Sequence, residues 1–173
     1  MTRRLEMIVT YLRMDHPPHE HVHPPANFKI ALMKVKNPQV HYYRYLYNTI
    51  GENYEWVDRQ LLSDEELASE IQADGVELYV AYVDGAPGGY FELDSRKGND
   101  VWLAYFGIMP QFIGTGLGKW LLHEALVTGW AKKPDAMRVE TCTLDHPRAL
   151  PLYQRMGFSP YKRRNKVVEA PEG

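Results

Sequence analysis

Apolar and polar residues alternate along this chain with two different spacings, which predict strands in some segments and helices in others. A period of two, or a short run rich in Val, Tyr and Phe, is typical of a strand. Strands are therefore expected over residues 3–14, 28–36, 76–83, 88–93, 101–109, 137–144 and 158–168. Apolar residues three and four apart predict helices, here over residues 40–50, 64–71, 116–131 and 146–156.

Local signals mark several boundaries between these elements. Ser63 can cap the second helix, with Glu66 as its capping-box partner. The pair Asp84-Gly85 between two strand patterns predicts a short hairpin. Gly107 lies inside a strand pattern, where a glycine often marks a bulge or a close approach of the backbone.

The order of elements indicates a mixed-sheet α/β domain. Residues 16–25 contain four prolines, which exclude a helix interior or a central strand, so this segment is expected to be a loop. We therefore predict an N-terminal extension over residues 1–27 and a main domain over residues 28–173. The strand in the extension could pair with the main sheet or with another subunit, and the second alternative suggests a homodimer.

Composition excludes several classes of protein. The 173 residues carry a net charge of −2 with a pI near 6.4, which gives no global basic field for nucleic acid. The basic run at residues 162–166 is expected to be a solvated strand edge. No stretch reaches transmembrane length and the start lacks the apolar core of a signal peptide, so we expect no membrane partner and a cytoplasmic protein. A single cysteine, Cys142, excludes an intramolecular disulfide.

Four histidines in the proline-rich loop raise the alternative of a metal-binding interaction protein. His16, His19, His21 and His23 are closely spaced, and neutral imidazoles bind zinc, copper or nickel. The loop has no cysteine partners, so we expect no metal site there. Cys142 is expected to be a small buried residue rather than a nucleophile.

The most informative stretch is a turn with three alternate glycines, Gly114, Gly116 and Gly118, between a strand and a helix. Glycine permits the turn dihedrals and lets phosphate oxygens reach the backbone amides at a helix N-terminus. A merely structural turn is the alternative. The dinucleotide fingerprint fits poorly because the preceding strands look antiparallel, and the P-loop is excluded because no Gly-Lys-Ser/Thr follows.

This stretch resembles motif A of the GNAT acetyltransferases. In the register that we prefer, Pro110 leads to Ile113 at the family's Arg or Gln position, and Gly116 and Gly118 are the two glycines. A second register would use Gln111 with Gly114 and Gly116. Downstream, residues 144–158 resemble the family's second signature, with His146 at the usual Asn position and matches at Ala149, Leu152, Tyr153, Gly157 and Phe158.

The resemblance covers residues 28–168 and implies the GNAT fold, a central, mostly antiparallel twisted sheet flanked by about four helices, with splayed fourth and fifth strands. It also implies direct transfer of an acetyl group from acetyl-CoA to a primary amine of a small molecule or peptide. The implied cofactor-binding residues are Ile108, Met109, Ile113, Gly114, Thr115, Gly116, Leu117, Gly118, Lys119, His146 and Tyr153.

Catalytic roles follow from the same resemblance. Tyr153 would donate a proton to the departing thiolate, and the backbone N–H of Ile108 would polarise the thioester carbonyl. Glu92 is the first candidate for the base, with Tyr105 as a weaker alternative. In this family the acceptor is usually recognised by the first two helices and the loop between them, here with Tyr54 and Trp56. Glu92 and Tyr105 are also expected to bind the acceptor. The departures at Ile113 and His146 leave a second hypothesis, a degenerate GNAT module that binds CoA without turnover.

Overall fold

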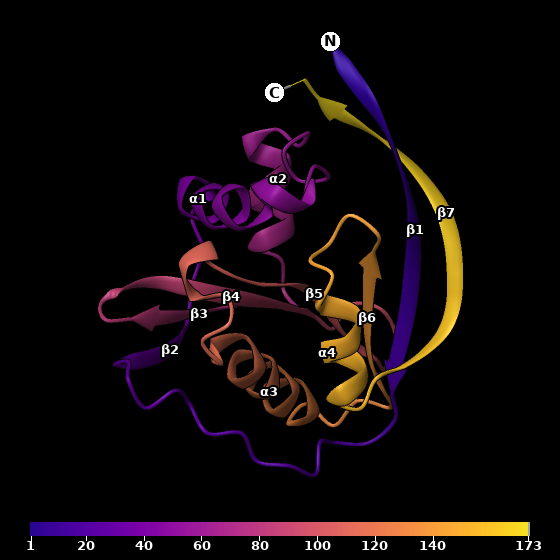
Figure 1. Ribbon diagram of the computed structural model, residues 1–173. Helices are drawn as coiled ribbons and strands as arrows, with labels where there is room; N and C mark the ends of the chain where they lie inside the picture. The colour runs from indigo at the N-terminus through magenta and orange to yellow at the C-terminus, as the bar shows by residue number, and fades with distance from the viewer. Residues whose placement is uncertain (173) are drawn as a thin grey trace.

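The computed structural model describes residues 1–172 of the chain, in which seven strands form one sheet in the order β2-β3-β4-β5-β6-β1-β7 (Figure 1). All neighbouring strands are antiparallel except β5 and β6, which are parallel. The strands are β1 (Thr2–Met14), β2 (Ile30–Lys34), β3 (Val76–Val83), β4 (Ala86–Asp94), β5 (Val101–Ile108), β6 (Met137–Cys142) and β7 (Ser159–Pro171).

Helices cover both faces of this sheet. The helices α1 (Val40–Gly51) and α2 (Asp64–Ile71) lie on one face, and α3 (Leu117–Trp130) and α4 (Ala149–Arg155) lie on the other (Figure 1). Two short 3₁₀ helices, η1 (Glu52–Tyr54) and η2 (Pro110–Phe112), follow α1 and β5. The prediction of a mixed, mostly antiparallel sheet flanked by four helices is confirmed.

Each face has its own hydrophobic core. On the α3 side, residues such as Phe91, Leu103 and Val139 from the sheet pack with Leu121 and Leu122 of α3. On the opposite side, a second cluster joins α1 and α2 to the middle of the sheet through Tyr43, Leu46, Tyr47, Ile50, Leu67, Ile71, Leu78, Val80 and Tyr90. Burial of apolar area on both faces holds the sheet between two helical layers.

The N-terminal strand belongs to the main sheet. β1 lies between β6 and β7, and its pairing with β7 extends from Thr2 opposite Pro171 to Arg13 opposite Ser159. Together β1 and β7 form a long curved ribbon at one edge of the molecule, with both termini at its upper end (Figure 1). Of the two alternatives for this strand, the structure therefore shows pairing within the same chain.

The parallel strands β5 and β6 separate after a short contact. Their pairing covers Val101 to Leu103 opposite Met137 to Val139 and then stops, although β5 continues to Ile108. Beyond Leu103 the backbone of β5 still pairs with β4 on its other side. The separation opens a gap at one end of the sheet and agrees with the expected splay of two strands.

Three of the local signals read from the sequence are confirmed. Asp84 and Gly85 both have positive φ, as a tight hairpin turn requires, and the Ser63 hydroxyl accepts a hydrogen bond from the Glu66 amide at 3.1 Å. Gly107 marks a close approach, because an added Cβ would lie 2.4 Å from Cγ2 of Ile50.

Within residues 1–172, none of the helices has the length and apolar character needed to span a bilayer.

Candidate active site

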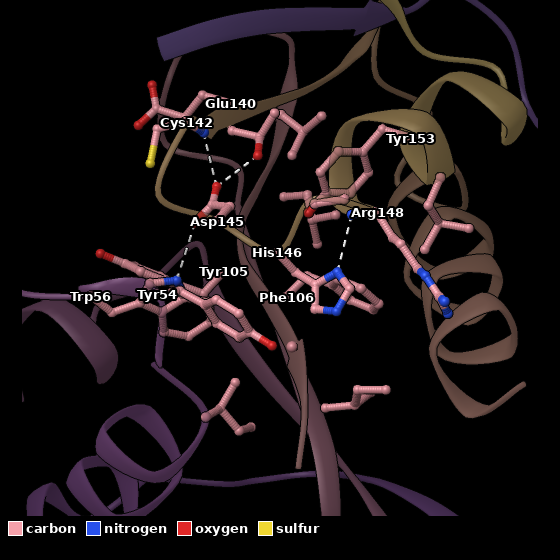
Figure 2. Close-up of a pocket in the computed structure, with 18 of the residues that line it drawn as sticks. Tyr54, Trp56, Tyr105, Phe106, Glu140, Cys142, Asp145, His146, Arg148 and Tyr153 are labelled. Carbon is pink, nitrogen blue, oxygen red and sulfur yellow. Dashed lines mark hydrogen bonds between the residues drawn. The ribbon is translucent and has the colours of Figure 1, made fainter. Parts of the chain in front are cut away.

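A cleft of about 430 Å³ opens where β5 and β6 separate. It begins at the glycine turn before α3, passes between the two strands and ends against the segment after η1 and the inner face of β1 and β7. Figure 2 shows its central part, where side chains from β5, β6, α4 and the segment after η1 point toward one another.

The glycine turn presents backbone groups to one end of this cleft. Gly114 and Gly116 have φ of 83° and 90°, in the left-handed region that favours glycine. Gly118 and Lys119 lie in the first turn of α3, where backbone amides have no carbonyl partner within the helix. Free amides and the helix dipole at this end could hold a diphosphate.

The residues expected to bind the cofactor fall into two groups. Those that line the cleft are Ile108, Ile113, Gly114, Gly116, Gly118, Lys119, His146 and Tyr153. Met109 and Leu117 are instead buried in the two cores, and the Thr115 hydroxyl is used locally, donating a 2.6 Å hydrogen bond to the Phe112 carbonyl. Ile113 lines the cleft and Gln111 of the second register does not.

Charged side chains of both signs line the cleft. Lys119 and Arg148 accompany the glycine turn and α4, and neither forms an ion pair within residues 1–172. At the other end the wall carries the carboxylates of Glu55, Asp58 and Asp145. Since Glu55 and Asp58 pair with Arg3 and Lys166, the charges without an ion-pair partner in residues 1–172 include Lys119 and Arg148, which suit an anion beside the glycine turn.

Tyr153 of α4 lies in the middle of the cleft wall. Its ring packs edge-on against Phe106 and Phe158, with centroid separations of 6.4 and 5.9 Å. Burial, and to a lesser degree the negative charge of Asp145, raises the pKa of its phenol. Tyr153 is therefore protonated at neutral pH, as an ordinary phenol also is, and its raised pKa makes it a weaker acid.

Aromatic side chains line the far end of the cleft. Trp56 packs against Tyr47 and Tyr105, with ring centroids 5.4 and 5.3 Å apart. Tyr54 contacts His146 edge-on at 5.8 Å. The structure thus brings the expected acceptor residues Tyr54, Trp56 and Tyr105 to one wall, next to His146 of the second motif (Figure 2).

Glu92, the first candidate for a base, does not lie in this cleft. Only 1% of its side chain is exposed, and its Oε1 atom accepts hydrogen bonds from Arg59 at 2.6 Å and from the Tyr43 hydroxyl at 2.8 Å. The pKa of Arg59 is raised, because Glu92 and Tyr43 outweigh the effect of burial, which alone would lower it. Glu92 therefore forms a buried ion pair with Arg59 and does not line the cleft.

Asp145 also lines the cleft, although it was not among the residues predicted from the sequence. Its Oδ2 atom accepts hydrogen bonds from the Thr141 hydroxyl at 2.6 Å and from the Cys142 amide at 2.9 Å. Its Oδ1 atom accepts a longer bond of 3.4 Å from Trp56 Nε1 (Figure 2). The available signal was an aspartate directly after a strand, where its side chain commonly bonds nearby backbone and forms a turn.

The surroundings of Cys142 differ from those of a reactive thiol, and the histidines of residues 16–23 are not arranged as a metal site. Burial and the charge of Asp145 raise the pKa of the half-buried Cys142 thiol, so the reactive thiolate is disfavoured. His21 packs edge-on against His23 and His123 at 4.7 and 5.6 Å. In the described part of the chain no three His, Cys, Asp or Glu side chains are placed to share a metal ion.

Comparison with known proteins identifies the family. Residues 43–158 match the model of the acetyltransferase (GNAT) family, whereas a search of curated proteins finds no match. Among solved structures, a GCN5-related N-acetyltransferase from Sphaerobacter thermophilus aligns with a TM-score of 0.66 at 17% identity, over 99% of this chain and 54% of that protein.

Two further structures share the fold. A protein from Novosphingobium aromaticivorans assigned to the GNAT family has a TM-score of 0.64 at 16% identity, over 99% of this chain and 68% of that one. A tandem GNAT protein from the clavulanic acid biosynthesis pathway has a TM-score of 0.63 at 17% identity, over 99% of this chain and 56% of its own length. This chain thus spans little more than half of two of these proteins, and at these identities the likeness concerns the fold. The family match over two thirds of the chain, together with this fold and the splayed strands, places the protein in the GNAT family of acetyltransferases.

Proposed function

We propose that this protein is an N-acetyltransferase that moves the acetyl group of acetyl-CoA directly to a primary amine of a small molecule or peptide. The observation that carries the proposal is the single cleft that joins a glycine-rich helix N-terminus to a carboxylate-bearing aromatic wall. Acetyl-CoA would span such a cleft, because its pantetheine arm separates the diphosphate from the reacting thioester carbonyl. Belonging to the GNAT family supports acyl transfer.

The residues of the cleft fit acetyl-CoA in the order of its parts. The amides of Gly116, Gly118 and Lys119 would hold the diphosphate, with Lys119 and Arg148 adding positive charge. The pantetheine arm would lie in the gap between β5 and β6, where β5 backbone beyond Leu103 has no strand partner on the β6 side. The N–H of Ile108 would polarise the thioester carbonyl.

Tyr153 would protonate the departing thiolate. Its phenol lines the cleft near Phe106, and a phenol carries its proton at neutral pH. A single proton donor of this kind contributes about 100-fold to 10,000-fold in rate. Tyr153→Phe should therefore lower kcat at least about 100-fold while leaving acetyl-CoA binding intact.

Thermal unfolding with increasing acetyl-CoA tests the binding half of the proposal, with nicotinamide dinucleotides and ATP as controls. At about a hundredfold excess over Kd, a ligand of the native state adds about 2.7 kcal/mol, which is roughly 5–11 °C for a chain of this size. Release of free thiol in the presence of amines then tests turnover. A specific shift without thiol release from any amine would favour the degenerate module, and no shift at millimolar acetyl-CoA would contradict the proposal.

A further inference from the structure

Four carboxylates line the cleft, and only one of them is both firmly held and free of a cationic partner. Glu55 pairs with Arg3 at 2.6 Å and Asp58 lies 3.8 Å from Lys166. Glu140 has no such partner within residues 1–172, but it is exposed, so water screens its charge. The remaining carboxylate is Asp145.

Asp145 is fixed in orientation by its hydrogen bonds. Both short bonds go to Oδ2, from the buried Thr141 hydroxyl at 2.6 Å and the Cys142 amide at 2.9 Å. Oδ1 receives only the 3.4 Å contact from Trp56 and so keeps acceptor capacity. Figure 2 shows the carboxylate between Trp56 on one side and the strand bearing Cys142 on the other.

The negative charge of Asp145 also changes the pKa values of other side chains that line the cleft. After burial, which is the larger cause, Asp145 raises the pKa of Tyr153, of Tyr54 and of the Cys142 thiol. These three side chains belong to different elements, and all of them line the cleft together with Asp145.

Apolar side chains also line this cleft. They include Ile50, Trp56 and Val57 from α1 and the segment after η1, and Met7, Val9 and Val168 from the β1–β7 ribbon. Such a lining suits an apolar body, and the carboxylate suits one ammonium group attached to it.

We propose that the acceptor is a cationic primary amine on an apolar, ring-sized body, and that Asp145 binds its ammonium group and takes its proton. This inference rests on the proposed acetyl transfer. Thr141 acts through Asp145 and is a positioning residue, because its hydroxyl makes the shortest bond to the carboxylate.

Asp145, Tyr153 and water account for every proton that moves in the reaction. One ammonium proton passes to Asp145 and on to water, and the amine nitrogen then forms a bond to the thioester carbon. The carbon–sulfur bond breaks, and the thiolate takes the proton of Tyr153. The second nitrogen proton, lost as the amide forms, restores Tyr153.

A pair of acceptors of the same size tests this role. Benzylamine is a cation at neutral pH, whereas phenylhydrazine is neutral and presents the same terminal NH₂ group, so only benzylamine needs a counter-ion and a base. Asp145→Asn keeps the shape and an oxygen acceptor for Thr141. We expect it to lower kcat/KM for benzylamine about 30-fold or more, and for phenylhydrazine less than about threefold.

Three control variants accompany this comparison. Thr141→Val should lower kcat/KM for benzylamine about tenfold through the lost hydrogen bond, and Thr141→Ser, which keeps the hydroxyl, should restore it. Asp135→Asn, at an exposed aspartate outside the cleft, should leave the rates for both acceptors unchanged. Each variant should keep the thermal shift given by acetyl-CoA.

The outcomes separate this inference from the proposed function. Equal loss of both acceptors in Asp145→Asn, or no loss of either, would overturn the role of Asp145. Wild-type transfer to neither acceptor would overturn the apolar amine as substrate class. The proposed function is decided separately, by the acetyl-CoA shift and by thiol release with other amines.

Discussion

The buried pair of Arg59 and Glu92 offers a test of how the segment after η1 is held against the sheet. The Arg59 side chain is 11% exposed and that of Glu92 1%, with 2.6 Å between Nη1 and Oε1. The guanidinium also stacks over Tyr105 and Tyr43, at 4.6 and 5.4 Å from the ring centroids. Arg59 follows Trp56 and Asp58, which line the cleft, so the ion pair anchors one of its walls.

Arg59→Met removes the guanidinium but keeps a side chain of similar length. The change leaves the Glu92 carboxylate buried with only the Tyr43 hydroxyl as a donor, and breaking a buried pair in this way costs about 3–5 kcal/mol. For a chain of this size, that corresponds to a fall in Tm of roughly 6–20 °C. The free energy of unfolding is measured with urea, and Tm by circular dichroism.

The double variant Arg59→Met/Glu92→Gln supplies the control. Once Glu92 is neutral, no unpaired carboxylate remains, so the double variant should lose less stability than the sum of the two single variants. If Arg59→Met costs under about 1 kcal/mol, or if the two losses simply add, the reasoning about this pair is wrong. Turnover by the folded double variant would in addition show that Glu92 is not the base.

Two further predictions concern packing and pH. Gly107→Ala should cost about 1–3 kcal/mol in urea unfolding, because the new Cβ would lie 2.4 Å from Cγ2 of Ile50; a loss under about 0.5 kcal/mol would contradict this. Burial alone would raise the pKa of Asp94, but hydrogen bonds from Arg96 outweigh it and the pKa is lowered. Asp94 therefore contributes stability that is present above its unfolded pKa and lost as the pH falls through the lower folded value. Urea unfolding between pH 6 and pH 3 should show a steeper loss for the wild type than for Asp94→Asn, and equal losses would refute the linkage.

Element types could be predicted from the sequence because periodicity reports which side of an element is buried. Each predicted helix and strand exists, although two boundaries near the cleft differ. The strand predicted to reach residue 144 ends at Cys142, and the helix predicted from residue 146 begins at Ala149. The cause is Asp145, which bonds to Thr141 and to the Cys142 amide and so folds residues 143–148 into a turn.

The long pairing of β1 with β7 could not be predicted in the same way. The last strand was expected to end near residue 168, where its apolar pattern ends, but it continues to Pro171 because Thr2 and Arg3 pair with it. Hydrogen bonds between backbones do not depend on side-chain pattern, so the sequence of β7 alone carries no sign of this partner. Lys162, Arg163 and Arg164 lie exposed on the edge strand, as expected, whereas Lys166 is half-buried and lines the cleft.

The position of β1 gives the cleft part of its lining at the end where the acceptor is proposed to bind. β1 separates β6 from β7, and its residues Met7 and Val9 line the cleft beside Lys166 and Val168 of β7. The same ribbon contacts the opposite wall through two ion pairs, Arg3 with Glu55 and Lys166 with Asp58. These pairs engage two of the lining carboxylates, so the β1–β7 ribbon contributes shape and leaves Asp145, within residues 1–172, as the firmly held carboxylate to which the proposed cationic acceptor would bind.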